Sequence, residues 1–225
     1  RFYYDASAVI AQEERAGRPV IVCGGTGLYF KALIEGLSEV PPVPDEVRER
    51  LRIETSDVPT PALHADLARR DPETAARLQP NDRLRVLRAL EVLEATGRSL
   101  VTFRGAKIPG PLAGRETRRI FLSPDRAALH ARIDARFRTM MEEGALDEVE
   151  ALASRGLDPH LPIMRAHGVP ALIAHLRGQM SREDAIARGQ ADTRAYTKRQ
   201  FTWFRHQIAD FAFVTPEDAA ALSLA

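Results

Sequence analysis

The pattern of apolar positions predicts an α/β chain with few strands. Residues 20–23 (Val-Ile-Val-Cys) form an uninterrupted apolar run, which is typical of a strand buried on both faces of a parallel sheet. Two further apolar runs, at 120–122 and 211–214, are interpreted as strands.

A glycine-rich turn follows the first predicted strand. Gly24 and Gly25 allow the backbone to turn tightly, and Thr26 is a suitable N-cap for a helix that begins at Leu28. Open parallel sheets place their ligands where a strand is followed by such a turn and a helix N-terminus. Ordinary strand-to-helix connections have the same pattern, so a functional and a purely structural interpretation both stay open.

Elsewhere the apolar residues recur with the period of a helix. The expected helices are 6–14, 45–52, 62–70, one between 72 and 80, 83–95, one between 125 and 144, one ending at 155, 168–176 and 181–206. Gly97 and Gly156 follow the last residues of two of these helices, where a left-handed glycine commonly ends a helix. Most of the chain is therefore predicted to be helical.

Proline marks the expected domain borders. Residues 41, 42 and 44 are prolines, which cannot continue a helix, and only helices are predicted between 41 and 100. We interpret 41–100 as an all-helical insertion between two α/β core parts, 1–40 and 101–225, the second mostly helical. Because the sequence opens inside a helical pattern, we expect it to begin inside a domain.

A basic segment follows the helical insertion. Residues 98–119 contain several glycines and prolines, and six cationic residues there face a single acidic one. A flexible basic loop is suited to contact phosphates, whereas the alternative is a solvated surface loop. The whole chain has a net charge of only +1, so a nucleic-acid partner would have to be bound by such local patches.

Composition excludes several other classes. The single cysteine, Cys23, is expected to be a small buried hydrophobic residue, so no disulfide forms within the chain. The six histidines lack metal-ligand spacing, so we expect no zinc site, and no Ser-His-Asp grouping is present. No apolar run approaches the roughly 18 residues of a membrane span. We expect a cytoplasmic protein that does not contact a membrane.

The last long helix combines cations with aromatic rings. Arg194 and Lys198 share one of its faces, and Tyr196, Arg199 and Trp203 share another. Proteins stack unpaired bases and hold phosphates with this mixture of side chains. An amphipathic helix with aromatic residues in the core and solvated charges is the alternative.

Three other arginines are candidates for anion contacts. Arg165 lies in the apolar run 161–168, so it is expected either to form a salt bridge or to face an anion. Arg85 and Arg88 lie one turn apart on the helix 83–95, although Arg88 could simply pair with a glutamate of its own helix.

Four stretches, in order along the chain, resemble the tRNA dimethylallyltransferases, also called the tRNA isopentenyltransferase family. They are Gly24-Gly25-Thr26-x-Leu28-Tyr29, Pro80-Asn81-Asp82-x-x-Arg85-x-x-Arg88-Ala89-Leu90-Glu91, the segment around Arg165, and Thr193-Arg194 with Lys198-Arg199-Gln200 and Thr202-Trp203. Arg48 is a further, weaker match. The chain departs from the family at Ala195, where many members have glutamine, and at Val169-Pro170.

The resemblance implies a P-loop NTPase-like parallel sheet core, incomplete at its N-terminus, with an all-helical insertion that binds tRNA. It implies transfer of a dimethylallyl group from its diphosphate to the exocyclic amine of the adenine beside the anticodon. Arg165 would hold the diphosphate and Thr26 would lie near the adenine, both as catalytic residues. The implied tRNA contacts are Thr26, Arg48, Arg85, Arg88, Arg194, Lys198, Arg199 and Gln200. We expect Thr26, Arg165 and Lys198 to line one tunnel for the base.

The family's phosphate-binding loop, G-x-x-x-x-G-K-[ST], and its Asp-Ser motif do not occur in the sequence. The ligands of the implied Mg²⁺ ion are expected in the missing front part, and we expect these 225 residues alone to be inactive monomers. An adenylate isopentenyltransferase and an RNA-binding remnant without catalysis are the alternatives. The helical insertion argues against the first, because a mononucleotide offers it nothing to bind.

Overall fold

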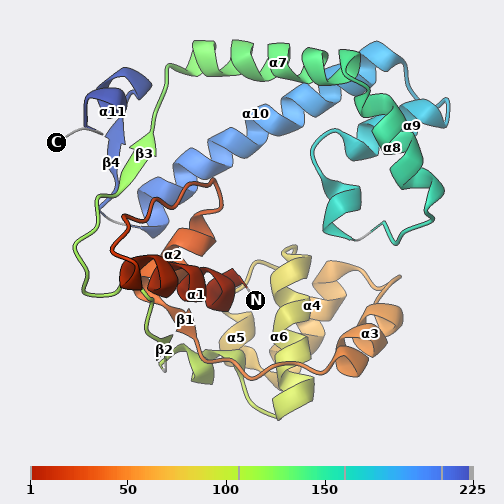
Figure 1. The fold of residues 1–225 in the computed structure, drawn as a ribbon. Helices are drawn as coiled ribbons and strands as arrows, with labels where there is room; N and C mark the ends of the chain where they lie inside the picture. Colours follow the sequence, from red (N-terminus) through yellow and green to blue (C-terminus); the bar gives the residue numbers. More distant parts are fainter. Residues whose placement is uncertain (1, 106, 160, 209, 223–225) are drawn as a thin grey trace. The chain divides into compact units, whose positions relative to one another are not determined.

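The computed structural model describes residues 2–105, 107–159, 161–208 and 210–222, which form two compact units. Unit 1 comprises the residues up to 21 and 28–116, and unit 2 comprises 22–27 and the residues from 117 onward. The elements of unit 1 are α1 (Phe2–Arg15), most of α2 (Gly27–Glu35), β1 (Leu37–Ser38), α3 (Asp45–Glu54), α4 (Thr60–Arg70), α5 (Pro72–Ala75), α6 (Arg83–Thr96), a 3₁₀ turn (Leu100–Arg104) and β2 (Lys107–Ile108). Figure 1 shows both units.

Helices form the core of unit 1, as the sequence predicted for 41–100. Every residue of that range is described, and none of them forms a strand. The face of α6 that carries Val86, Ala89 and Leu90 packs on Leu63 and Leu67 of α4. These five side chains are at most 6 % exposed, so their burial supplies much of the driving force for folding of this unit.

The basic segment 98–119 is more ordered than a flexible loop. Its β2 pairs antiparallel with β1, with Leu37 opposite Ile108. Lys107 lies 3.7 Å from Glu35, and Arg115 pairs with Glu14. Part of the charge of this segment is therefore already neutralised inside unit 1, which leaves less of it to contact phosphates.

Unit 2 contains a short parallel sheet and a helical layer. Its elements are β3 (Ile120–Leu122), α7 (Arg126–Glu142), α8 (Ala145–Ser154), a second 3₁₀ turn (Pro162–Arg165), α9 (Val169–Leu176), α10 (Arg182–Gln207), β4 (Ala212–Val214) and α11 (Pro216–Leu222). β3 and β4 pair in parallel, which confirms two of the predicted strands. α10 packs against α7 and α9, and α8 packs against α9 and α7, as Figure 1 illustrates.

Side-chain caps and a left-handed glycine explain where helices of unit 2 begin and end. The Asp125 side chain accepts a hydrogen bond from the Ala128 N–H at the start of α7, and Ser181 accepts one from Asp184 at the start of α10. Gly156, with φ of 60°, follows the end of α8. Between its ends, α10 continues for 26 residues without a break.

The predicted strand at 20–23 is not present. Residues 20–24 have no regular secondary structure, Ile21 is 84 % exposed, and Cys23 is exposed rather than buried. A parallel strand forms only where neighbouring strands accept its hydrogen bonds, and the described residues offer this run no such neighbour. The helix predicted after the turn is confirmed, because α2 begins at Gly27, directly after Thr26.

The parallel core of the described chain is thus smaller than expected. Its strands form two separate two-stranded sheets, β1–β2 antiparallel and β3–β4 parallel, and the rest of its regular structure is helical. Aromatic side chains fill the space beside β3, where the Phe121 ring lies 4.9 Å from Phe201 and 4.7 Å from both Phe204 and Phe213.

Asp71 joins two elements of unit 1 and generates a stability prediction. Its side chain is buried, and Oδ1 accepts hydrogen bonds from the Thr74 N–H (3.1 Å) and the Ser99 hydroxyl (2.9 Å). Burial by itself would raise the pKa of the Asp71 carboxyl, but these hydrogen bonds hold that pKa below its ordinary value. The carboxylate therefore stabilises the folded state above the unfolded pKa of about 3.9, and this stability is lost as the pH falls through the lower folded pKa.

We expect Asp71→Ala to lower the unfolding free energy by about 1–2 kcal/mol at pH 7, because a cap and a buried acceptor are lost. The difference from the parent chain should shrink below about pH 4. Urea unfolding followed by circular dichroism at both pH values measures it. The exposed Asp57 is the control, and Asp57→Ala should change stability by less than about 0.5 kcal/mol. An equal loss at pH 3 and pH 7 would contradict the role given to the charge.

Candidate functional site

The turn before α2 lies directly against α10. The side-chain amide of Gln200 donates a hydrogen bond of 2.9 Å to the backbone oxygen of Gly25. A Cβ atom at Gly25 would overlap that amide, and a Cβ at Gly27 would overlap the ring of Trp203. Glycine at these two positions is therefore what lets backbone and helix approach so closely. Two stretches predicted to be functional, 175 residues apart in sequence, meet here.

A second loop contacts the same face of α10. The ring of His167, two residues after Arg165, lies 5.0 Å from the ring of Tyr196. Tyr196 and Gln200 are one helical turn apart and so lie on one side of the helix. The segment that carries Arg165 and the turn that carries Thr26 consequently contact neighbouring positions on α10.

The predicted cations around this face differ in their surroundings. Arg165 is exposed at the end of its 3₁₀ turn and has no ion pair within the part of the chain that the structure describes. The guanidinium of Arg199 lies 5.7 Å from the centre of the Tyr196 ring, on the side where the loops contact the helix. Lys198 is exposed, but it is two residues from both Tyr196 and Gln200 and lies on another side of α10.

Arg194 is not a solvated side chain. Its guanidinium pairs with Oδ1 of Asp134 on α7, and both side chains are 30 % exposed. The neighbouring Gln190 is buried and donates a hydrogen bond of 3.0 Å to the backbone oxygen of Asp134. This group of residues connects α10 to α7.

The remaining predicted tRNA contacts belong to unit 1. Arg48 pairs with Asp45 (3.2 Å), Arg85 with Asp82 (2.9 Å) and Arg88 with Glu91 (3.4 Å). Each partner is three residues away on the same helix or at its cap. Partly exposed pairs of this kind contribute little to stability, so a phosphate can replace the carboxylate at small cost.

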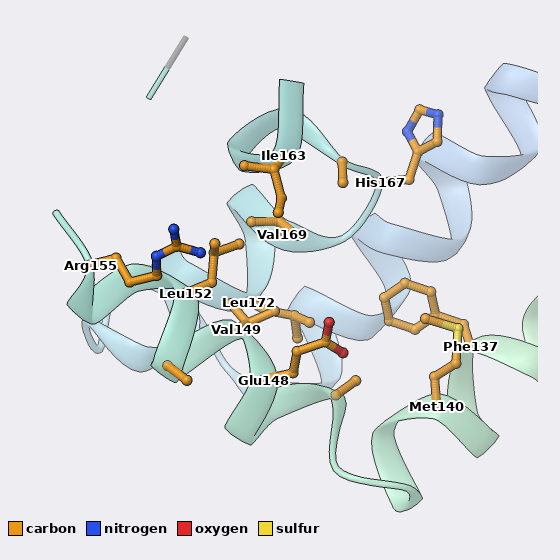
Figure 2. A pocket seen from close by; sticks show the side chains of 13 residues that line it. Phe137, Met140, Glu148, Val149, Leu152, Arg155, Ile163, His167, Val169 and Leu172 are labelled. Atoms are coloured by element: carbon orange, nitrogen blue, oxygen red, sulfur yellow. The ribbon is translucent and has the colours of Figure 1, made fainter. Parts of the chain in front are cut away.

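Unit 2 also contains a cavity of about 440 Å³ that the sequence did not predict (Figure 2). Phe137, Leu172 and other apolar side chains of α7, α8 and α9 line it, together with the polar side chains of Glu148, Arg155 and His167. Apolar residues at helical spacing are normally assigned to a filled core, so nothing in the sequence distinguished these from core positions.

Among the described residues, no group of three or more His, Cys, Asp or Glu side chains is arranged to hold a metal ion. The residues present therefore do not fit the Mg²⁺ ion that the resemblance implies, and we derive no step through it. No helix in the described ranges is long and apolar enough to cross a membrane.

A comparison with protein-family models gives a match to the IPP transferase model over residues 1–207. The chain belongs to the IPP transferase family. A curated relative, the tRNA dimethylallyltransferase of Methylobacterium radiotolerans, is 63 % identical over 224 residues, which are 99 % of this chain and 72 % of that protein. The tRNA dimethylallyltransferase of a Bradyrhizobium strain is 57 % identical over 218 residues, 97 % of this chain and 71 % of that protein. The resemblance noted in the sequence is therefore confirmed, and the family is one of transferases.

Solved structures agree with the IPP transferase assignment. The full-length tRNA isopentenylpyrophosphate transferase of Bacillus halodurans has a TM-score of 0.59 and 31 % identity, covering 95 % of this chain and 65 % of that one. A eukaryotic dimethylallyltransferase captured acting on tRNA has a TM-score of 0.69 and 26 % identity, covering 100 % of this chain and 58 % of that one. The chain thus spans a little under two thirds of these two structures.

Three residues of this candidate site were not predicted from the sequence. Gly27 is as necessary as Gly25 for the contact with α10, and the Gly25-Thr26-Gly27 spacing was the available signal. His167 lacks metal-ligand spacing, and no pattern in the sequence indicates its ring contact with Tyr196. Asp134 gave no signal at all, because one aspartate on an amphipathic helix is normally solvated.

The contact of Gly27 with Trp203 gives a prediction with a built-in reporter. In an isolated helix Gly27→Ala would be favourable, but here the added Cβ must displace the indole ring. We expect a loss of about 1–3 kcal/mol in unfolding free energy and a shift in fluorescence from Trp203, the single tryptophan of the chain. Gly105→Ala is the control, since a Cβ there has no atom within 4 Å. A Gly27→Ala protein as stable as the parent, with unchanged emission, would refute the close approach.

Proposed function

We propose that the protein transfers the dimethylallyl group of dimethylallyl diphosphate to the exocyclic amine of the adenine adjacent to the anticodon in tRNA. The observation that carries this proposal is the contact of the Gly25–Gly27 turn with Gln200 and Trp203, because it joins two family motifs into one site. Membership in the IPP transferase family supports the same reaction. In the transfer, a nitrogen–carbon bond forms, the carbon–oxygen bond to diphosphate breaks, and the amine loses a proton.

Arg165 is the proposed contact for the diphosphate. A guanidinium presents five N–H donors and stays charged, which suits it to a leaving group that gains negative charge as the bond breaks. Its exposure, and the lack of an ion-pair partner within the described residues, leave those donors available. Thr26, exposed at the turn beside Gln200, is the proposed contact near the adenine.

Both units contribute proposed tRNA contacts. In unit 2 they are Lys198, Arg199 and Gln200, with the Tyr196 ring available for stacking on an unpaired base. In unit 1 they are Arg48, Arg85 and Arg88 within the helical segment 41–100, which we propose as a tRNA-binding lobe. The target amine is unreachable in a stacked anticodon loop, so the adenine has to be extruded before transfer.

A chimera tests the proposed reaction. These 225 residues would replace the aligned part of the Methylobacterium radiotolerans relative, and transfer from labelled dimethylallyl diphosphate to an anticodon stem-loop RNA would be measured. We expect the chimera to be active and the 225 residues alone to be inactive, because the latter contain no phosphate-binding loop motif. Adenosine monophosphate is the second acceptor. Transfer to it in preference to the RNA would favour an adenylate isopentenyltransferase and contradict the proposal.

Within the chimera, Arg165→Gln isolates the contact with the diphosphate. We expect kcat to fall by about 100-fold, since one charged donor to the leaving group is removed, while affinity for the RNA stays within about threefold. Arg177→Gln, which removes an exposed arginine at the end of α9, is the matched control and should retain the parent kcat. A loss of RNA affinity with unchanged kcat would assign Arg165 to the RNA instead.

A further inference from the structure

We infer that Asp134 of α7 is a positioning residue for α10, the helix that carries the proposed RNA contacts Tyr196 and Gln200. In this inference Arg194 acts through Asp134 rather than by contacting RNA. The inference rests on the proposed function, since it concerns how the RNA site is held in place. It assigns a role to an aspartate that no family motif in the sequence includes. It also changes the role expected for Arg194.

Two polar contacts converge on Asp134 from α10. Arg194 pairs with its carboxylate, and the buried Gln190 donates to its backbone oxygen. Gln190 and Arg194 are one helical turn apart, so both contacts come from one side of α10. A residue that receives two bonds from one helix fixes both the rotation and the axial position of that helix.

The same face of α7 holds the second segment of the site. Phe137, one turn after Asp134, is buried, and a Cβ at Gly168 or at Gly189 would overlap its ring. Gly168 follows the loop that carries Arg165 and His167, and Gly189 lies on α10. Asp134 and Phe137 therefore fix α10 and the Arg165 loop against one common surface.

The surroundings of Arg194 argue against a phosphate contact. Its guanidinium is already paired and is 30 % exposed, so turning toward RNA would leave the carboxylate of Asp134 partly buried without a partner. One turn later on the same side of α10, Lys198 is exposed and has no ion pair within the described ranges. Lys198 is thus better placed than Arg194 to bind a phosphate on this side of the helix.

Loss of the Asp134 contacts would be transmitted to the site through α10. Arg194 precedes Tyr196 by two residues and Gln200 by six, within one unbroken helix. A rotation or shift of this helix would separate Tyr196 from His167 and Gln200 from Gly25. RNA affinity is then reduced although every residue that contacts RNA is intact.

Charge reversal tests the inference on the 225-residue chain, with a fluorescent anticodon stem-loop RNA as the probe. Asp134→Arg and Arg194→Asp should each weaken RNA binding about tenfold, because each puts like charges together. The double variant restores opposite charges and should bind within about threefold of the parent. If Arg194 itself contacts a phosphate, the double variant stays as weak as Arg194→Asp, and the inference is overturned.

The salt dependence of binding supplies an independent readout. Each lost phosphate contact reduces the slope of log affinity against log salt by about one. We expect Lys198→Gln to reduce the slope by that amount and Arg194→Gln to leave it unchanged, while still weakening binding. A reduced slope for Arg194→Gln would contradict the positioning role.

Thermal unfolding without RNA separates this inference from the proposed function. The Asp134–Arg194 cycle should show coupling, with the double variant more stable than either single variant. If the parent chain fails to bind the RNA, the proposed RNA site is refuted. Coupling between the two substitutions in thermal unfolding would still support Asp134 as the anchor of α10. If the effects of the two substitutions on thermal stability simply add, the role of Asp134 as the anchor of α10 is refuted, even if the chain binds RNA.

Discussion

The candidate site depends on one close approach, that of the backbone at Gly25–Gly27 to the side chains of Gln200 and Trp203. At Gly27 the approach requires the absence of a Cβ, which would overlap the ring of Trp203. At Gly25 a Cβ would displace the Gln200 amide that donates to the backbone oxygen. The approach fixes Thr26 at a defined height along α10. The other contacts of the site, from His167 and from α7, are made to the same helix, α10, that this turn holds in place.

The ion-paired arginines among the predicted tRNA contacts fall into two physical groups, and the distinction bears on which of these arginines is available to bind an anion. Arg48 and Arg85 pair with carboxylates three residues away in partly or fully solvated positions, where the pair is worth little and exchanges readily. Arg194 pairs with a carboxylate 60 residues away in a partly buried position, where separating the charges is expensive. A sequence motif treats these residues alike, but only the first group has a charge available for RNA.

Local signals in the sequence were reliable because they act over a few residues. The caps at Asp125 and Ser181 and the glycine at 156 follow from the bonding needs of helix ends, so the ends of their helices were predictable. The strand at 20–23 failed for the opposite reason, since a strand exists only with a hydrogen-bonded neighbour far away in sequence. The family motifs supplied Gln200 and Thr26 as candidates, but their contact, and the role of Asp134, depend on how helices pack and could not be derived from spacing.

The charge balance of the chain limits how strongly it can attract RNA in general. A net charge of +1 gives little general attraction to a polyanion, and pairs such as Lys107–Glu35 and Arg115–Glu14 neutralise part of the basic segment 98–119. In the proposed function, RNA affinity therefore has to come from a few cations at fixed positions. Fixed positions require a rigid support, and the contacts of Asp134 and Phe137 with α10 provide one. An enzyme that must extrude one adenine gains from this arrangement, because weak general attraction leaves discrimination to the geometry of the site.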